Sequence, residues 1–291
     1  MSYGETEAVR GIDLEVRQGE IFAFLGPNGA GKTSTVEILE GYRRRTGGEV
    51  SVLGEDPAHA GSAWRDRIGI VLQSNSLDPY LTVCESLELY AGYFSHPRSV
   101  EETIALIGLE GKADDRARKL SGGQQRRLDV GMALVGDPEL LFLDEPTTGF
   151  DPSARRQFWE VIAGLRELGK TVFLTTHYMD EAQRLADRVT IIAAGRVVAR
   201  GTPADLGARD GGATTIRYRA EGREVALETT DPVKALHELT GAALARGEEL
   251  EGLEVTRPTL EDVYLELTAS AEASDAEAAA EPDPEPAEAR R

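Results

Sequence analysis

A glycine-rich loop that directly follows a short apolar run constrains this chain more than any other feature. Residues 20–25 predict a strand, and a helix is expected from Lys32. Strand, loop and helix in this order form the context that a phosphate-binding loop requires. The loop and the start of the helix read Gly26-Pro27-Asn28-Gly29-Ala30-Gly31-Lys32-Thr33.

The residue types in this loop suit the β- and γ-phosphates of a nucleotide. Its glycines let successive backbone N–H groups point at a phosphate, and the following helix adds its positive N-terminal end. Lys32 would reach the β- and γ-phosphates, and Thr33 is placed to ligate Mg²⁺. The predicted nucleotide-binding set is Gly26, Pro27, Asn28, Gly29, Ala30, Gly31, Lys32, Thr33 and Ser34.

A second apolar run, residues 140–143, ends in two acidic residues, Asp144 and Glu145. A carboxylate at the carboxyl end of a strand can hold the magnesium ion of a bound nucleotide, a role that we assign to Asp144. Glu145 would then point toward the attacking water as a general base. The alternative is a strand followed by two solvated acids before Pro146, and the phosphate-binding loop weighs against it.

Alternating strands and helices predict an α/β fold with a mainly parallel sheet covered by helices on both faces. Two helices without an intervening strand are expected between residues 81 and 109, the second with the capping pattern Ser99-Val100-Glu101-Glu102. We interpret residues from about 81 to 135 as an inserted helical subdomain. The predicted strands are 8–16, paired with 20–25 around Gln18-Gly19, then 49–53, 67–72, 140–143, 171–175 and 189–193.

The pattern changes after about residue 205. Runs at 214–219 and 224–229 alternate as strands do, a helix is expected from Asp231-Pro232, and another over residues 260–267. Residues 211–268 are therefore predicted to form a small α+β accessory domain, which we interpret as a structural lid in preference to a regulatory sensor. Residues 269–291, rich in Ala, Glu and Pro, are expected to be a disordered, solubilising tail.

Charge and hydropathy argue against a nucleic-acid-binding protein, a membrane-spanning protein and a secreted protein. The formal net charge is -19, and the tail from residue 271 contributes seven acids against two arginines, so the remainder is acidic as well. An acidic field disfavours nucleic acid as a partner. No apolar run approaches the length that spans a bilayer, and the first ten residues do not resemble a secretory signal. The single Cys84 cannot form an internal disulfide, so we expect the cytoplasm.

Leu120-Ser121-Gly122-Gly123-Gln124 is the third informative run. Alone it predicts only a capped helix start. Between the phosphate-binding loop and the acidic strand end, it makes residues 3–205 resemble an ATP-binding cassette (ABC) ATPase. The resemblance implies a P-loop NTPase core with an antiparallel β edge, and ATP and Mg²⁺ as ligands. It also implies that Ser121, Gly122, Gly123 and Gln124 close over the ATP of a second copy in a head-to-tail dimer.

Further roles are implied by the same resemblance. Tyr3 matches the aromatic residue that stacks on adenine, although the family normally has another strand before it. Gln73 matches the glutamine that contacts the metal and the water, and His177 the histidine that contacts the γ-phosphate. Residues 149–152 match the loop that crosses to the partner, with Phe150 where the family usually has Leu, a change expected to affect packing more than chemistry.

The resemblance also implies a membrane partner. Residues 73–81 occupy the place where family members receive a separate multi-span permease subunit, which would put this chain on the cytoplasmic face of the cell membrane. Residues 124–129 and 257–265 resemble the daunorubicin-resistance type of exporter, which favours export of drugs, lipids or other amphipathic compounds. The alternatives are a soluble ABC ATPase of translation or DNA repair, which usually has two cassettes or a long coiled-coil insertion, and a nucleotide-binding regulator without turnover.

Overall fold

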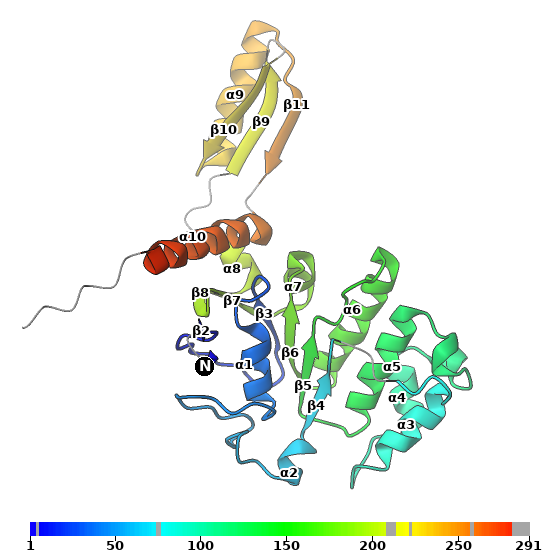
Figure 1. Ribbon diagram of the computed structural model, residues 1–291. Coiled ribbons are helices and arrows are strands. Elements are labelled where there is room, and N and C mark those ends of the chain that lie inside the picture. The colour runs from blue at the N-terminus through cyan, green and yellow to red at the C-terminus, as the bar shows by residue number, and fades with distance from the viewer. Residues whose placement is uncertain (4–5, 74–76, 208–213, 221–222, 257–258, 281–291) are drawn as a thin grey trace, which may run out of the picture.

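A six-stranded sheet forms the centre of the computed structural model, which describes residues 1–3, 6–73, 77–207, 214–220, 223–256 and 259–280 (Figure 1). Its strands are ordered β4 (Ile68–Val71), β5 (Leu140–Asp144), β6 (Thr171–Thr176), β3 (Ile21–Leu25), β7 (Arg188–Ala193) and β8 (Arg196–Gly201). All neighbouring pairs are parallel except β7 and β8. The predicted mainly parallel sheet with an antiparallel edge is confirmed.

Successive residues of the central strands bury their side chains on opposite faces of the sheet. Phe22, Phe24 and Phe142 surround Phe173, with ring centroids 5.3, 5.7 and 5.6 Å from it. On that face the cluster includes Val36 from α1 (Lys32–Leu39), whereas the neighbouring strand residues pack with α6 (Pro152–Glu167) on the other. Burial on both faces explains why these strands read as continuous apolar runs. Two further short helices are α2 (Ser62–Arg65) and α7 (Met179–Leu185).

A group of helices lies beside the edge strand β4 (Figure 1). It comprises α3 (Val83–Ala91), α4 (Val100–Leu106), the short 3₁₀ turns η1 (Glu110–Lys112) and η2 (Ala117–Lys119), and α5 (Gly122–Leu134). Thr82 and Glu85 form a capping box at α3, and Ser99 accepts a hydrogen bond from Glu102 N at 3.4 Å. The two consecutive helices predicted between residues 81 and 109 are therefore present.

Two predicted strands are absent from the described residues. Residues 8–16 form no strand, and residues 49–53 contribute only an isolated bridge between Val52 and Glu55. Val9, Ile12 and Val16 still turn apolar side chains toward the core. The alternation of apolar and polar residues in this segment therefore reflects burial of one side and not pairing with another strand. The chain begins instead with a small ribbon of β1 (Ser2–Tyr3) and β2 (Thr6–Glu7).

The C-terminal elements differ from expectation at the last helix. A separate sheet, ordered β10 (Arg223–Thr229), β9 (Thr214–Ala220) and β11 (Glu251–Thr256), carries α9 (Pro232–Arg246), whose N-cap is Asp231 as predicted. The helix predicted over residues 260–267 is α10 (Leu260–Ala280), so the disorder expected from residue 269 is wrong for residues 269–280.

Helix α10 packs on the six-stranded sheet unit. It contacts α7, α8 (Pro203–Gly207), β7 and β8, and Leu260 is buried there beside Met179 and Ala182. The small sheet with α9 is therefore inserted between α8 and α10, two elements that pack on each other (Figure 1). Among the described residues, no helix is both long and apolar enough to cross a membrane.

Candidate functional site

The sheet brings the ends of four adjacent strands to one edge. Strands β4, β5, β6 and β3 run parallel, so their carboxyl ends meet there. Gln73 follows β4, Glu145 follows β5, His177 follows β6, and the glycine-rich loop follows β3. Residues scattered over the sequence are thereby placed next to one another, and polar side chains at this edge can act on one ligand.

The glycine-rich loop needs glycine where the backbone approaches other segments. Gly31 has a φ of 101°, in the left-handed region that side chains disfavour, and a Cβ there would collide with the carbonyl oxygen of Ala8. A Cβ on Gly26 would collide with the carbonyl of Ile192. The loop therefore lies tightly against its own domain and leaves its outer side to a ligand, with Asn28 and Gly29 exposed.

Lys32 lies under this loop with its side chain only 7% exposed. Its ammonium donates to the carbonyl oxygens of Gly26 at 2.6 Å and Pro27 at 3.1 Å. Burial lowers the pKa of Lys32, while the carboxylates of Glu145 and Asp144 oppose that shift. The arrangement keeps a desolvated cation at the loop, beside the exposed Thr33 and the half-buried Ser34.

Glu145 is the point at which the other side chains converge. Its Oε2 accepts hydrogen bonds from Gln73 Nε2 and Thr148 Oγ1, each at 3.3 Å, and lies 3.3 Å from His177 Nδ1. Its Oε1 lies 3.9 Å from Lys32 Nζ. With 12% of the side chain exposed, the carboxylate is shielded yet reachable from solvent. It can therefore accept a proton from a water molecule at the strand edge.

Thr175 organises both acidic residues from the neighbouring strand. Its hydroxyl donates to Asp144 Oδ1 and accepts from the backbone N–H of Glu145 at 3.0 Å. Glu145 itself has a φ of 42°, a left-handed conformation that costs free energy in a residue other than glycine. Sequence reasoning missed Thr175 and Thr148, because a threonine in or near an apolar strand reads as an ordinary β-former. Their place at the carboxyl ends of strands was the available signal.

The run from Leu120 to Gln124 begins helix α5, as predicted. Ser121 is the N-cap and accepts from Gln124 N at 3.3 Å, while the Gln124 side chain accepts from Ser121 N at 2.9 Å. This helix lies against β4, and β5 and β6 separate β4 from the strand that leads into the loop. The structure therefore does not bring this run to the phosphate-binding loop of the same chain.

Two residues named by resemblance have different outcomes. Phe150 takes a packing position, as expected: its ring meets that of Phe158 edge-on at 5.7 Å and lies beside Gly123. Tyr3 belongs to β1, but its side chain lies outside the described residues.

Comparison with known proteins identifies the family. A family model described as "ABC transporter" matches residues 9–148. The Nod factor export ATP-binding protein I of Paraburkholderia xenovorans is 39% identical over 92% of this chain and 94% of its own length. The daunorubicin resistance ATP-binding protein DrrA3 of Streptomyces coeruleorubidus is 36% identical over 91% and 92%.

A solved structure agrees with these relatives. It is the dimeric, post-hydrolysis state of the ATP-binding cassette MJ0796 bound to ADP and Pi, which matches with a TM-score of 0.61 and 27% identity over 69% of this chain and 94% of that chain. The sheet order, the loop after β3 and the helix begun by Ser121 to Gln124 are thus explained together: the chain belongs to the ABC transporter family and is one of its ATP-binding, ATP-hydrolysing subunits.

Proposed function

We propose that this chain powers an exporter of drugs, lipids or other amphipathic compounds by hydrolysing ATP between two copies of itself. The observation that carries the proposal is the convergence of Gln73, His177 and Lys32 on Glu145, in a chain whose Ser121–Gln124 helix start lies elsewhere. Export is favoured because the relatives named for Nod factor export and daunorubicin resistance align with more than nine-tenths of the chain.

Each site residue has a proposed role in hydrolysis. Glu145 accepts the proton of the attacking water, and Gln73 orients that water. Lys32 and His177 stabilise the negative charge that develops on the γ-phosphate. The loop residues from Gly26 to Ser34 hold the phosphates, and Tyr3 stacks on the adenine ring.

Mg²⁺ fits the oxygen donors at this edge. Asp144 supplies a carboxylate at the end of β5, and Thr33 exposes a hydroxyl at the start of α1. Hard oxygen ligands of this kind suit Mg²⁺, which usually keeps waters and phosphate oxygens in its remaining positions. Asp144, Thr33 and Gln73 would hold the ion. When bound, it neutralises negative charge on the phosphates.

The second half of the site comes from a second copy. Ser121, Gly122, Gly123 and Gln124 of one copy cover the ATP held by the loop of the other in a head-to-tail dimer. ATP binding closes the dimer, and hydrolysis opens it. The dimeric cassette MJ0796 supports this assembly.

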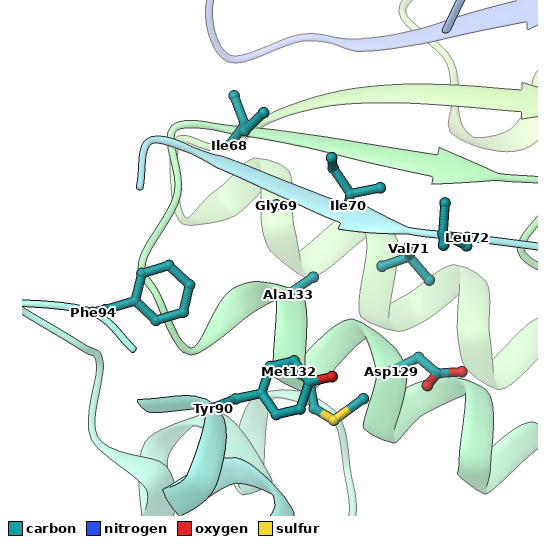
Figure 2. A pocket seen from close by; sticks show the side chains of 10 residues that line it. All are labelled: Ile68, Gly69, Ile70, Val71, Leu72, Tyr90, Phe94, Asp129, Met132 and Ala133. Atoms are coloured by element: carbon teal, nitrogen blue, oxygen red, sulfur yellow. The ribbon is translucent and has the colours of Figure 1, made fainter. Parts of the chain in front are cut away.

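The proposed receiving site for a separate multi-span membrane subunit is residues 73–81, of which 74–76 lie outside the described residues, and we extend it to the groove beside β4 that precedes them. The groove is lined by residues 68–72, by Tyr90 of α3 and Phe94 just after it, and by Asp129, Met132 and Ala133 of α5 (Figure 2). Leu72 is exposed, and Tyr90 and Met132 also line an adjoining pocket with Leu89 and Tyr93. Docking there would hold the chain at the cytoplasmic face of the membrane and would pull directly on Gln73 at the end of β4.

The division of the chain is part of the proposal. Residues 1–205 form the nucleotide-binding domain, with the helical subdomain at about 81–135. Residues 211–268 were expected to form one accessory domain, and we now propose that β9, β10, α9 and β11 alone form it. Because α10 packs on α8, β7 and β8, the small sheet is a structural lid joined to the nucleotide-binding domain at both of its ends.

Glu145→Gln tests the proposed reaction. The amide cannot accept the proton, so the ATP hydrolysis rate is expected to fall by at least about a hundredfold. ATP binding should persist and ATP-dependent dimers should accumulate on size-exclusion chromatography. Glu160→Gln, on the exposed face of α6, is the matched control. Turnover at the wild-type rate in Glu145→Gln would refute the role of Glu145.

Co-purification tests the transport role. The chain expressed in its own cells should be recovered from detergent extracts with a multi-span membrane protein. Recovery with ribosomes instead would overturn transport and favour a soluble ABC ATPase.

A further inference from the structure

Arg126 is a buried arginine that donates to three backbone carbonyl oxygens and lies near one acidic side chain. It is 4% exposed and lies in α5, between that helix and the ends of β4 and β5. Its Nε donates to Pro146 O at 3.1 Å, its Nη2 to Asp144 O at 2.9 Å, and its Nη1 to Leu72 O. One guanidinium thus joins three segments that are far apart in the sequence.

The three carbonyl groups are the neighbours of the proposed hydrolytic residues. Asp144 and Pro146 flank Glu145, and Leu72 precedes Gln73. The left-handed backbone of Glu145 persists only if the surrounding structure holds it. The Thr175 hydroxyl accepts a hydrogen bond from the N–H of Glu145, and Arg126 donates to the carbonyl groups of the two residues that flank Glu145.

Arg126 also lies close to the start of its helix. Ser121 caps α5, and Gln124 completes the capping box, so Arg126 follows the proposed partner-facing segment within about a turn of helix. One turn further on, Asp129 Oδ2 lies 3.9 Å from Arg126 Nη1 and belongs to the groove wall seen in Figure 2. Arg126 therefore lies near the start of α5, beside the groove residue Asp129, and contacts the carboxyl ends of β4 and β5.

The chemistry of arginine suits this place. Its planar guanidinium has five N–H donors in a fixed fork, whereas a lysine ammonium is a compact point charge that cannot span three divergent acceptors. Burial lowers the pKa of Arg126, with Asp129, Asp144 and Glu181 opposing the shift. A desolvated cation is costly unless its donors are used, and here they are used on the backbone around the hydrolytic residues.

We propose that Arg126 is a positioning residue that fixes the backbone of Glu145 and Gln73 relative to the N-terminus of α5. Seating of Ser121–Gln124 on the ATP of a second copy is thereby linked to the geometry of this copy's own Glu145. The inference rests on the proposed function, because it assumes that Glu145 and Gln73 act in hydrolysis. The three hydrogen bonds of Arg126 go to the ends of β4 and β5 and not to the phosphate-binding loop.

Arg126→Lys and Arg126→Gln test the proposal, with Arg127→Lys as the matched control. Arg127 is the next residue of the same helix and donates to Gly108 O at 3.1 Å, away from the strand ends. We expect kcat for ATP hydrolysis to fall at least about tenfold in both Arg126 variants, since small misplacements of reacting groups have large kinetic effects. The KM for ATP should stay within about threefold, and Arg127→Lys should keep kcat within about twofold.

A second measurement separates positioning from a general loss of structure. Arg126→Lys placed in the Glu145→Gln background should still form ATP-dependent dimers and unfold in one cooperative urea transition, at a midpoint below that of Arg127→Lys because buried carbonyl groups lose their donors. A kcat within twofold of wild type, an equal loss in Arg127→Lys, a rise in KM that parallels the fall in kcat, or failure of both Arg126 variants to fold would overturn the proposal. If Glu145→Gln alone formed no dimers, the proposed function would fail instead.

Discussion

Replacing Thr175 by Val removes one hydroxyl that serves both acidic residues of the site. Thr175 is 1% exposed, donates to Asp144 Oδ1 and accepts from Glu145 N. A hydrogen bond to a charged group contributes about 1.5–3 kcal/mol. The lower end applies here because Asp144 is partly exposed. The Glu145 N–H keeps a second acceptor, Thr175 O at 3.1 Å, so its loss adds little.

The expected cost of Thr175→Val is therefore about 2 kcal/mol in the free energy of unfolding. Thr175→Ser is the matched control, because it keeps the hydroxyl and loses one methyl group, at about 1 kcal/mol. Unfolding in urea measures the difference between the two variants. The valine variant should also lose at least about tenfold in kcat, because Asp144 and Glu145 both lose a fixed orientation, while the serine variant should stay within about threefold.

Two outcomes would contradict the role of the Thr175 hydroxyl. If Val and Ser at position 175 had equal kcat, the hydroxyl would not orient the acidic residues, whatever their stabilities. If the valine variant were the more stable of the two by about 1 kcal/mol or more, burial of the methyl group would outweigh the hydrogen bonds of the hydroxyl.

The remaining predictions concern packing and pH. Gly69→Ala should destabilise the fold by about 1–3 kcal/mol in urea unfolding, because a Cβ on Gly69 would lie 2.7 Å from Ala133 O of α5; no loss would show that α5 can move away from β4. Gly164→Ala, in α6 with nothing within 4 Å of the new Cβ, should stabilise by up to about 1 kcal/mol, and a loss there would contradict the open space. Burial, followed by Asp144 and Glu37, raises the pKa of Glu40 from 4.5 to about 7. The folded protein thus favours the protonated Glu40 carboxyl, and the free energy of unfolding falls as pH rises from 4.5 to about 7. Glu40→Gln should remove the contribution of Glu40 to this fall, and parallel curves of stability against pH for the two proteins would refute the raised pKa.

The fold could be predicted well where long-range pairing buries a strand on both faces. Residues 140–143 and 171–175 are continuous apolar runs, and both are central strands. Residues 8–16 and 49–53 alternate because one side of each segment is covered by the core, and alternation does not reveal whether a neighbouring backbone is available for pairing. Helix α10 was expected to be shorter, since Ala- and Glu-rich sequence suits both a solvated tail and a helix.

The reacting groups of the candidate site could be predicted from the sequence, but the residues that hold those groups in place could not. Lys32, Asp144 and Glu145 can be recognised from their sequence motifs and spacing, and the parallel sheet brings them to one edge. Arg126 acts on backbone carbonyl groups, and the Thr175 hydroxyl acts on the Asp144 side chain and the Glu145 N–H; Asp144 lies 31 residues from Thr175, and Leu72 lies 54 residues from Arg126. Such contacts depend on tertiary packing, which no local pattern specifies.

The sheet also explains why one copy is proposed to be insufficient. Helix α5 is held to β4 by Arg126 and by packing, and β4 is separated from β3 by β5 and β6. Hydrogen-bonded strands cannot slide past one another without breaking their ladders, so the sheet keeps Ser121 apart from the loop at Gly26–Thr33. The first N–H groups of a helix lack partners within it, so in the proposed dimer those of Gly122 and Gly123 would bind a phosphate brought by another molecule. In the proposed dimer a second copy closes the site, and the sheet that separates the two motifs within one chain also fixes the positions of Glu145 and Gln73.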